Sequence, residues 1–187
     1  MALDRLWAGW RSAYVTGEGV DIAGDPPSTA SAGTESTEGS LFERILTCGL
    51  PDERTFVLWR GTHCAALLNI YPYTTGHLMV LPRRAVADLD GLEPDESAEL
   101  WAGVQLAVRA LRAAYQPEGI NVGANLGTAA GAGVPDHLHV HVLPRWSGDT
   151  NFMTTLAETR VLPESLEQTW LKLRSAWPES PAPDRGR

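Results

Sequence analysis

The sequence lacks most of the features that mark a membrane, secreted or metal-rich protein. No stretch approaches the roughly 20 consecutive apolar residues that span a bilayer. Residues 1–7 mix charged with aromatic side chains where a signal peptide needs an apolar run. The only two cysteines, Cys48 and Cys64, match no metal-binding spacing. We therefore expect a cytoplasmic protein with no membrane segment, in which both cysteines are ordinary thiols in or near the core.

Positive charge is also scarce. Lysine plus arginine number 15 against 23 aspartates and glutamates, which gives a formal net charge of −8. A surface this acidic argues against nucleic acid as a partner, because such binding needs a basic face. It leaves room for a small anionic ligand, which needs only a local positive site.

Composition divides the chain into four parts. Residues 1–15 form an aromatic arm, and residues 16–39 are mostly Gly, Ser, Thr, Pro and acidic residues, which is typical of a flexible linker. Residues 40–177 carry the apolar patterns of a folded domain, and residues 178–187 read as a frayed, disordered tail.

The folded part is predicted to be α+β. A long helix with an apolar stripe runs from Pro94 to about Gln116, and most other elements are short strands in hairpin-like order. This order favours an antiparallel sheet of about five strands rather than a doubly wound one. The expected strands are Thr55–Arg60, His63–Asn69, Gly76–Leu81, Gly119–Leu126 and His137–Leu143, with a short helix from Ser40 to Cys48 and a last helix over 164–175.

Three of the five histidines fall within five residues, at His137, His139 and His141. In a strand these three side chains share one face, and the apolar residues between them share the other. A rise of about 3.3 Å per residue puts neighbours about 6.6 Å apart and the outer two about 13 Å apart. One ligand atom can therefore touch His139 and one neighbour, but not all three.

This row suits nucleophilic chemistry. A neutral imidazole, with a usual pKa of about 6.5, is a competent nucleophile when one ring nitrogen is free and the other is held. Flanking histidines can take up charge on a phosphoryl group. A histidine of this row is therefore a candidate nucleophile. Two alternatives stay open: a metal site built on two of the three, which would need further ligands, and three strand histidines without a role.

Two segments carry a family resemblance. The run HLHVHVLPR at 137–145 resembles the signature of the histidine triad family of nucleotide hydrolases and transferases. The run NIYPYTTGHLMVLP at 69–82 is similar to the family's second motif, which contains a glycine-histidine pair. The resemblance covers roughly residues 42–155 and implies the family's α+β fold. The runs WAGWRSAY near the N-terminus and WSGDTNFM after the triad resemble the bacterial branch that contains diadenosine tetraphosphate phosphorylases.

The resemblance implies a role for each of four histidines. His139 would attack the α-phosphate and form a nucleotidyl-histidine intermediate. His141 and His77 would hold the phosphate oxygens, and His137 would support the strand and position the nucleophile.

The resemblance also implies a set of binding residues. Asn69, eight positions before His77, would bind ribose hydroxyls, and Asn125 would contact the phosphate or the leaving group. Small residues in the loop before the triad would let backbone N–H groups approach an anion, and a tryptophan after it would stack on a base or belong to the core. These last positions are Gly131, Ala132, Gly133 and Trp146.

The sequence departs from the family pattern at a metal site. Many bacterial members carry a Cys-x-x-Cys pair in the first helix and a histidine after the second motif, which bind structural zinc together with the first triad histidine. Here those three positions are Ser40, Glu43 and Ala85. We therefore predict no metal, no other cofactor, and a His137 that is free of zinc.

A second departure concerns the leaving group. Many relatives have a serine just before the triad, where this chain has Gly133 or Val134, depending on how the loop is counted. Neither side chain has a hydroxyl, so a backbone N–H, Thr128 or Asn125 would have to serve the leaving group.

The implied function is nucleotidyl transfer or hydrolysis on an adenine-type dinucleoside polyphosphate, with phosphate or water as the acceptor. Three alternatives remain: a nucleoside phosphoramidate hydrolase, a nucleotide-sensing module with little turnover, and a metal enzyme. Large apolar side chains in peripheral segments predict a homodimer or larger homo-oligomer; they are Trp7, Trp10, Phe152, Trp170 and Trp177.

Overall fold

The structure is a computed structural model, and it describes residues 39–150 and 162–178. The predicted arm, nearly all of the predicted linker and the tail beyond residue 178 lie outside the described residues. No helix within the described ranges is long and apolar enough to cross a membrane.

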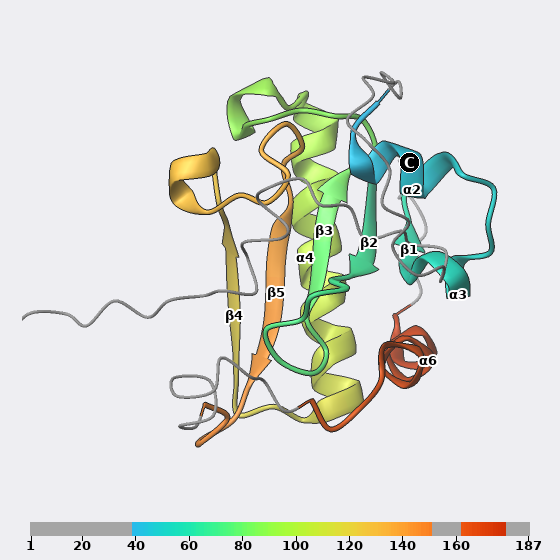
Figure 1. Cartoon of the computed structure of the whole chain (residues 1–187), viewed down its shortest axis with the longest axis vertical. Coiled ribbons are helices and arrows are strands. Elements are labelled where there is room, and N and C mark those ends of the chain that lie inside the picture. Colours follow the sequence, from blue (N-terminus) through green and yellow to red (C-terminus); the bar gives the residue numbers. More distant parts are fainter. Residues whose placement is uncertain (1–38, 151–161, 179–187) are drawn as a thin grey trace, which may run out of the picture.

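A single antiparallel sheet forms the centre of the molecule. Its five strands lie in the order β1-β2-β3-β5-β4, so β3 and β5 are neighbours although α4 and β4 separate them in sequence. Figure 1 shows the long helix α4 lying across one face of this sheet. The predicted α+β fold is confirmed. The strands are β1 Val57–Arg60, β2 Cys64–Leu68, β3 Leu78–Pro82, β4 Gly119–Ala124 and β5 Val140–Arg145.

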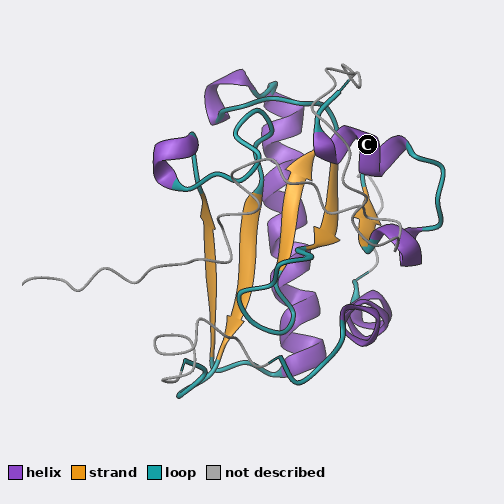
Figure 2. Ribbon diagram, in the orientation of Figure 1, coloured by secondary structure: helices purple, strands orange, loops and turns teal. Residues whose placement is uncertain are grey.

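Local sequence explains where the helices begin and end. Ser40 caps α2 and Ser165 caps α6, each with a reciprocal bond from a residue three positions on. Pro94 opens α4 and Gln116 ends it in the left-handed conformation, just before Pro117. The α-helices are α2 Leu41–Thr47, α3 Asp52–Thr55, α4 Pro94–Tyr115 and α6 Leu166–Ala176, and short 3₁₀ turns cover Leu89–Gly91 and Thr128–Ala130 (Figure 2).

The two faces of the sheet bury different residues. On one face, Leu78 and Val80 of β3 pack with the apolar stripe of α4. Helix and sheet approach closely at Gly103, where an added Cβ would lie 2.9 Å from atoms of Trp59 and Val80. On the other face, a smaller cluster under α2 includes Phe42, Leu46, Leu67, Met79 and Leu81. The histidines lie on this second face.

Three strand predictions were wrong at their starts, and one of them is β3, which begins at Leu78 rather than at Gly76. Thr55 ends α3, and Phe56 then adopts a left-handed conformation (φ 54°) before β1 begins at Val57. The strand predicted over His137–Leu143 begins only at Val140, because the Leu138 N–H donates to the Val86 carbonyl in the loop after β3 rather than to a strand. It continues to Arg145, which lies opposite Gly119 of β4.

Two tryptophans expected at an assembly surface pack within the chain instead. Trp170 and Trp177 lie against the core on the α4 face. The Trp170 indole donates to the Val57 carbonyl at 2.8 Å, and the Trp177 ring stacks near Trp59 at 6.5 Å. Their apolar area therefore does not support an interface, whereas Trp7, Trp10 and Phe152 lie outside the described residues. Cys64 is buried as expected, but Cys48 is exposed.

Candidate active site

Four buried histidines meet on the α2 face of the sheet. Strand pairing puts His141 of β5 opposite Met79 of β3, two residues beyond His77. The ring centroid of His141 is 5.1 Å from that of His77 and 4.9 Å from that of His139. The structure thus brings His77, from a distant motif, together with His139 and His141. The fifth histidine, His63, is exposed in the turn between β1 and β2.

A hydrogen bond at one ring nitrogen of His139 shows which of its two nitrogens carries the lone pair. Its Nδ1 lies 2.8 Å from the His137 carbonyl oxygen, which can only accept, so Nδ1 carries the proton. Nε2 then carries the lone pair when the ring is neutral. Burial lowers the pKa of His139 from its usual value of 6.5, and this effect outweighs the bond to the His137 carbonyl, which raises the pKa. The ring is therefore neutral at pH 7, as a nitrogen nucleophile must be.

A backbone N–H next to the His77–His141 pair orients both rings. The backbone N–H of Tyr73 donates to His77 Nδ1 at 3.0 Å, so the proton of neutral His77 lies on Nε2. That N–H points at His141 Nδ1, 2.9 Å away, and the proton of neutral His141 is then on Nε2. The Tyr73 N–H, the His77 ring and the His141 ring thus form a chain of hydrogen bonds whose dipoles are aligned beside His139. Dipoles aligned in this way can stabilise negative charge on a phosphoryl oxygen.

His137 faces a different set of groups. Its Nε2 lies 2.8 Å from the Pro82 carbonyl, so that nitrogen donates, and its Nδ1 lies 2.5 Å from the Ser40 hydroxyl. The edge of the ring meets Phe42 at a centroid distance of 5.2 Å, and Phe42 also contacts His139 at 5.3 Å. Burial lowers the pKa of His137, and this ring too is neutral.

The two predicted binding asparagines lie at opposite edges of the histidine cluster. Asn69 follows β2, accepts from the Tyr71 N–H at 2.9 Å and has its amide nitrogen 3.4 Å from His77 Nδ1. Asn125 follows β4, whose Gly123 lies opposite His141. Its amide nitrogen approaches the Gly131 carbonyl at 3.5 Å.

Three N–H groups of the small-residue loop over 127–133 bond within the loop, and two of them belong to the predicted binding residues Gly131 and Ala132. The Gly131 N–H donates to the Thr128 carbonyl and the Ala132 N–H to the Gly127 carbonyl, at 2.9 and 3.2 Å. In this structure those two groups close the loop rather than point toward an anion. Gly133, next in the chain, remains the loop position predicted to approach phosphate.

Trp146 lines a cavity of about 600 Å³ beyond the end of β5. Tyr73 lines the same cavity, and its ring lies 4.5 Å from that of His77 and 5.7 Å from that of His141. None of the histidines lines this cavity among the described residues, so it adjoins the His77–His141 pair rather than His139. Trp146 itself packs edge-on to Tyr115 at 6.3 Å.

Sequence reasoning missed three residues of the cluster. Tyr73 and Phe42 contact the histidine rings, and Ser40 was considered only as a helix cap and as a replaced metal ligand. Tyr73 falls inside the second motif, so its position near His77 was a usable signal. Nothing in the sequence pointed Phe42 at His139.

Comparison with known proteins agrees with this geometry. A sequence profile of the HIT domain matches residues 51–148, more than half of the chain. The chain belongs to the HIT family. An AP-4-A phosphorylase of Mycobacterium tuberculosis is 42% identical to this HIT protein over 179 residues, which cover 96% of this chain and 87% of the relative.

Solved structures give the same result for the fold. A Zn-bound histidine triad family protein from Mycobacterium smegmatis has a TM-score of 0.59 and 30% identity to this HIT protein, over 73% of this chain and 91% of that one. A hypothetical histidine triad nucleotide-binding protein from Sulfolobus tokodaii also has a TM-score of 0.59, with 28% identity over 72% and 89%.

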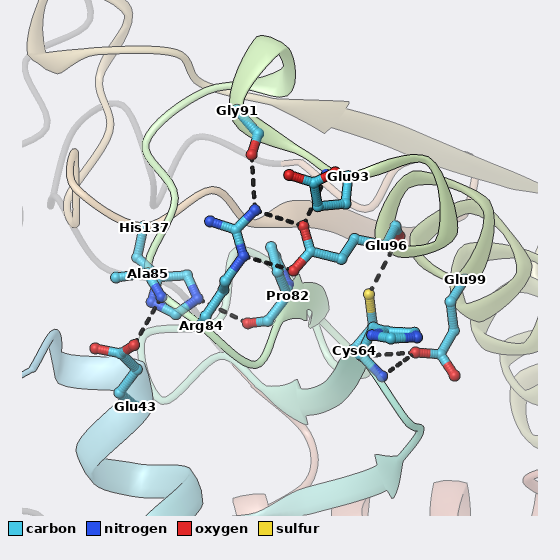
Figure 3. A network of polar contacts seen from close by, with 11 residues as sticks. Glu43, Cys64, Pro82, Arg84, Ala85, Gly91, Glu93, Glu96, Glu99 and His137 are labelled. Carbon is cyan, nitrogen blue, oxygen red and sulfur yellow. Dashed lines mark hydrogen bonds and ion pairs between the residues drawn. The ribbon is translucent and has the colours of Figure 1, made fainter.

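The side chains of this HIT protein do not fit a zinc ion at the metal position that the family resemblance implied. Ser40 and both nitrogens of His137 are already engaged, and the side chain of Ala85 has no donor atom. Figure 3 shows the bond between His137 and Pro82 and the bond between Glu43 and Ala85. Glu43 accepts the Ala85 N–H through Oε1 and the Ser40 N–H through Oε2, each at 2.8 Å. These two bonds lower the pKa of Glu43. Among the described residues, no three His, Cys, Asp or Glu side chains gather as metal ligands do.

The lowered pKa of His139 predicts the pH dependence of this HIT protein. Because burial disfavours the charged form, His139 stays neutral to lower pH than a free histidine, and only the neutral ring can act as a nucleophile. If His139 has that role, we expect the acid limb of kcat/KM to be centred below pH 6.5. A pH profile of kcat/KM checks this, and an acid limb centred above pH 6.5 would contradict it.

Proposed function

We propose that this HIT protein cleaves adenine dinucleoside polyphosphates by nucleotidyl transfer through His139, with phosphate as the acceptor. The observation that carries the proposal is the buried, neutral His139 ring. Its Nδ1 proton is held by the His137 carbonyl, which leaves the Nε2 lone pair beside His141. The similarity to an AP-4-A phosphorylase over 96% of the chain supports the substrate class.

In the first step His139 Nε2 attacks the α-phosphorus of diadenosine tetraphosphate. A nitrogen–phosphorus bond forms, the bond from the α-phosphorus to the bridging oxygen breaks, and ATP leaves. The Nε2–H of His141 stabilises the charge that moves onto the phosphoryl oxygens, and His77 supports it by donating its own N–H to His141 Nδ1. The aligned donor chain from the Tyr73 N–H supports this role.

In the second step an oxygen of inorganic phosphate attacks the same phosphorus. The nitrogen–phosphorus bond breaks, the His139 lone pair is restored, and ADP is released. Water in place of phosphate would give AMP. His137 contributes its carbonyl, which keeps the His139 proton on Nδ1 through both steps.

The binding roles follow the position of each residue around the cluster. Asn69, beside His77 at the end of β2, binds the ribose hydroxyls, and Asn125 with the Gly133 N–H contacts the leaving phosphates across from it. The cavity lined by Trp146 accepts an aromatic base. Both thiols are free, the exposed Cys48 included, which fits the proposed cytoplasmic location.

The product formed with and without phosphate tests this function. Diadenosine tetraphosphate is incubated with the protein in phosphate buffer and in a phosphate-free buffer, and nucleotides are separated by chromatography. We expect ADP and ATP in equal amounts with phosphate, and no ADP without it. AMP and ATP in both buffers would make the protein a hydrolase instead. Cleavage of adenosine phosphoramidate, with no turnover of the tetraphosphate, would favour the phosphoramidate reading.

We further propose that the protein is a homodimer that pairs through β4. Within residues 39–150 and 162–178, β4 pairs only with β5, so its other edge faces outward. Val122 and Leu126, on and just after this strand, are 43% and 38% exposed. An open edge strand with apolar side chains favours pairing with another chain. Light scattering at micromolar concentration should give the mass of a dimer, and a monomer would refute this proposal.

A further inference from the structure

The orientation of the His139 ring depends on the backbone at His137, which lies outside the sheet. The His137 carbonyl holds the His139 proton, but β5 begins only at Val140. No strand ladder therefore fixes that carbonyl. The backbone around it has two bonds of its own, from the His137 N–H to Val134 and from the Leu138 N–H to Val86.

The side chain of His137 supplies the missing restraint. Its fully buried ring is fixed at both nitrogens, by the Pro82 carbonyl at 2.8 Å and by the Ser40 hydroxyl at 2.5 Å. Figure 3 shows the ring directed at Pro82, at the end of β3, with the first turns of α2 nearby. Since Nε2 must donate to the carbonyl, Nδ1 of the neutral ring must accept. Ser40 is then the donor.

Ser40 can make this bond and cap its helix at the same time. A hydroxyl has one proton to donate and lone pairs to accept. The proton goes to His137 Nδ1, and a lone pair accepts the Glu43 N–H at 3.3 Å. The residue is buried and lies 97 positions away from His137 in the sequence. The Ser40 hydroxyl that caps α2 thus also orients His137, and the His137 carbonyl orients His139.

We propose that Ser40 is a positioning residue for the reaction, acting through His137 on the tautomer and aim of His139. The proposal rests on the proposed function. Without the hydroxyl, Nδ1 of a buried ring loses its only donor, and the ring must turn or admit water. The His137 carbonyl then moves, and the His139 lone pair loses its alignment with the phosphorus. Substrate binding, which Ser40 does not contact, stays intact.

Three substitutions separate this role from helix capping. Ser40→Ala removes both the cap and the donor. Ser40→Gly removes the donor, but glycine is a fair N-cap and keeps most of the helix stability. Ser40→Thr keeps the hydroxyl. The matched control is Ser165→Ala, because Ser165 caps α6 with the same geometry, accepting the Gln168 N–H at 3.3 Å, in a different part of the fold.

The measurement is kcat and KM for diadenosine tetraphosphate with phosphate, together with the denaturant midpoint of each variant. We expect kcat to fall about tenfold in Ser40→Ala and Ser40→Gly, the effect of one lost hydrogen bond, with KM unchanged. Ser40→Thr should recover most of kcat. Ser165→Ala should lose stability but keep kcat.

Two results would overturn the role of Ser40 while the proposed function stands. One is wild-type kcat in Ser40→Gly, and the other is a loss of kcat in Ser165→Ala that matches its loss of stability. The nitrogen chemical shifts of the His137 ring report the hydrogen bonds at that ring and do not depend on the stability of the fold. A shift of Nδ1 in Ser40→Gly toward the value of an unbonded imidazole nitrogen is expected, and an unchanged shift would contradict the proposal. Absence of turnover in the wild-type protein would instead refute the proposed function.

Discussion

Replacement of His139 by alanine is expected to reduce turnover of diadenosine tetraphosphate by about four orders of magnitude or more. The variant loses the only lone pair that the hydrogen bonds aim into the cluster, because His137 is bonded at both ring nitrogens and His77 directs its Nε2 proton at His141. Binding of the nucleotide should survive. Steady-state kinetics and a separate measurement of nucleotide affinity test the two expectations.

The matched control is His63→Ala. His63 is a histidine of the same chain, but it is exposed in the turn between β1 and β2 and lies outside the cluster. Its replacement should leave kcat and KM near the wild-type values. If His139→Ala retained a tenth of the wild-type rate, another group would have to be the nucleophile.

The second large effect is expected for His77→Leu. Leucine removes the N–H that His77 directs at His141 Nδ1, 2.9 Å away, and with it the link to the Tyr73 N–H. The buried His141 Nδ1 is left without that donor. His77 donates to His141 Nδ1 rather than to the oxyanion itself, so its loss weakens the preorganised His141 donor, and we expect kcat to fall by up to about the hundred- to thousandfold that removal of such a donor costs.

A second variant at the same position separates charge stabilisation from packing. His77→Gln keeps an N–H donor on a side chain of similar reach, so it should recover part of the rate that His77→Leu loses. The denaturant midpoints of both variants show whether either has simply unfolded. Equal losses of kcat in the two, with midpoints like that of the wild type, would contradict a role for this donor.

Much of the fold could be predicted from the sequence, because local patterns determine it. The apolar stripe and the Pro94 start defined α4, and the alternation in the two motifs put the histidines on one face of an antiparallel sheet. Strand starts were less accurate. Thr55 and His137 have residue types that suit a strand, but their backbone hydrogen bonds go elsewhere, and tertiary contacts decided the outcome.

The parts of the site that could not be predicted are long-range contacts. The Ser40–His137 bond joins residues 97 positions apart, and no periodicity encodes it. The packing of Trp170 and Trp177 on the core likewise depends on where α6 docks, so their apolar character alone suggested an interface. The tautomers of His77 and His139 depend on which backbone groups face each ring nitrogen, which only coordinates provide.

The three positions where relatives have zinc ligands also show how the sequence and the structure differ in what they reveal. The sequence indicated that Ser40, Glu43 and Ala85 differ from the zinc ligands of relatives. It did not indicate that these residues would bond to one another and to His137. In the fold they form hydrogen bonds between α2, the loop after β3 and the triad, and Figure 3 shows the one between Glu43 and Ala85. A network of this kind can hold the same segments together without an ion.

Direct trapping of the intermediate tests the central claim. The protein is mixed with diadenosine tetraphosphate in phosphate-free buffer, denatured at alkaline pH to preserve a nitrogen–phosphorus bond, digested and analysed by mass spectrometry. An adenylyl group on His139 is predicted, lost when phosphate is added before denaturation and absent from His139→Ala. Turnover without any adduct, or an adduct on a different residue that persists in His139→Ala, would contradict the assignment of His139 as the nucleophile.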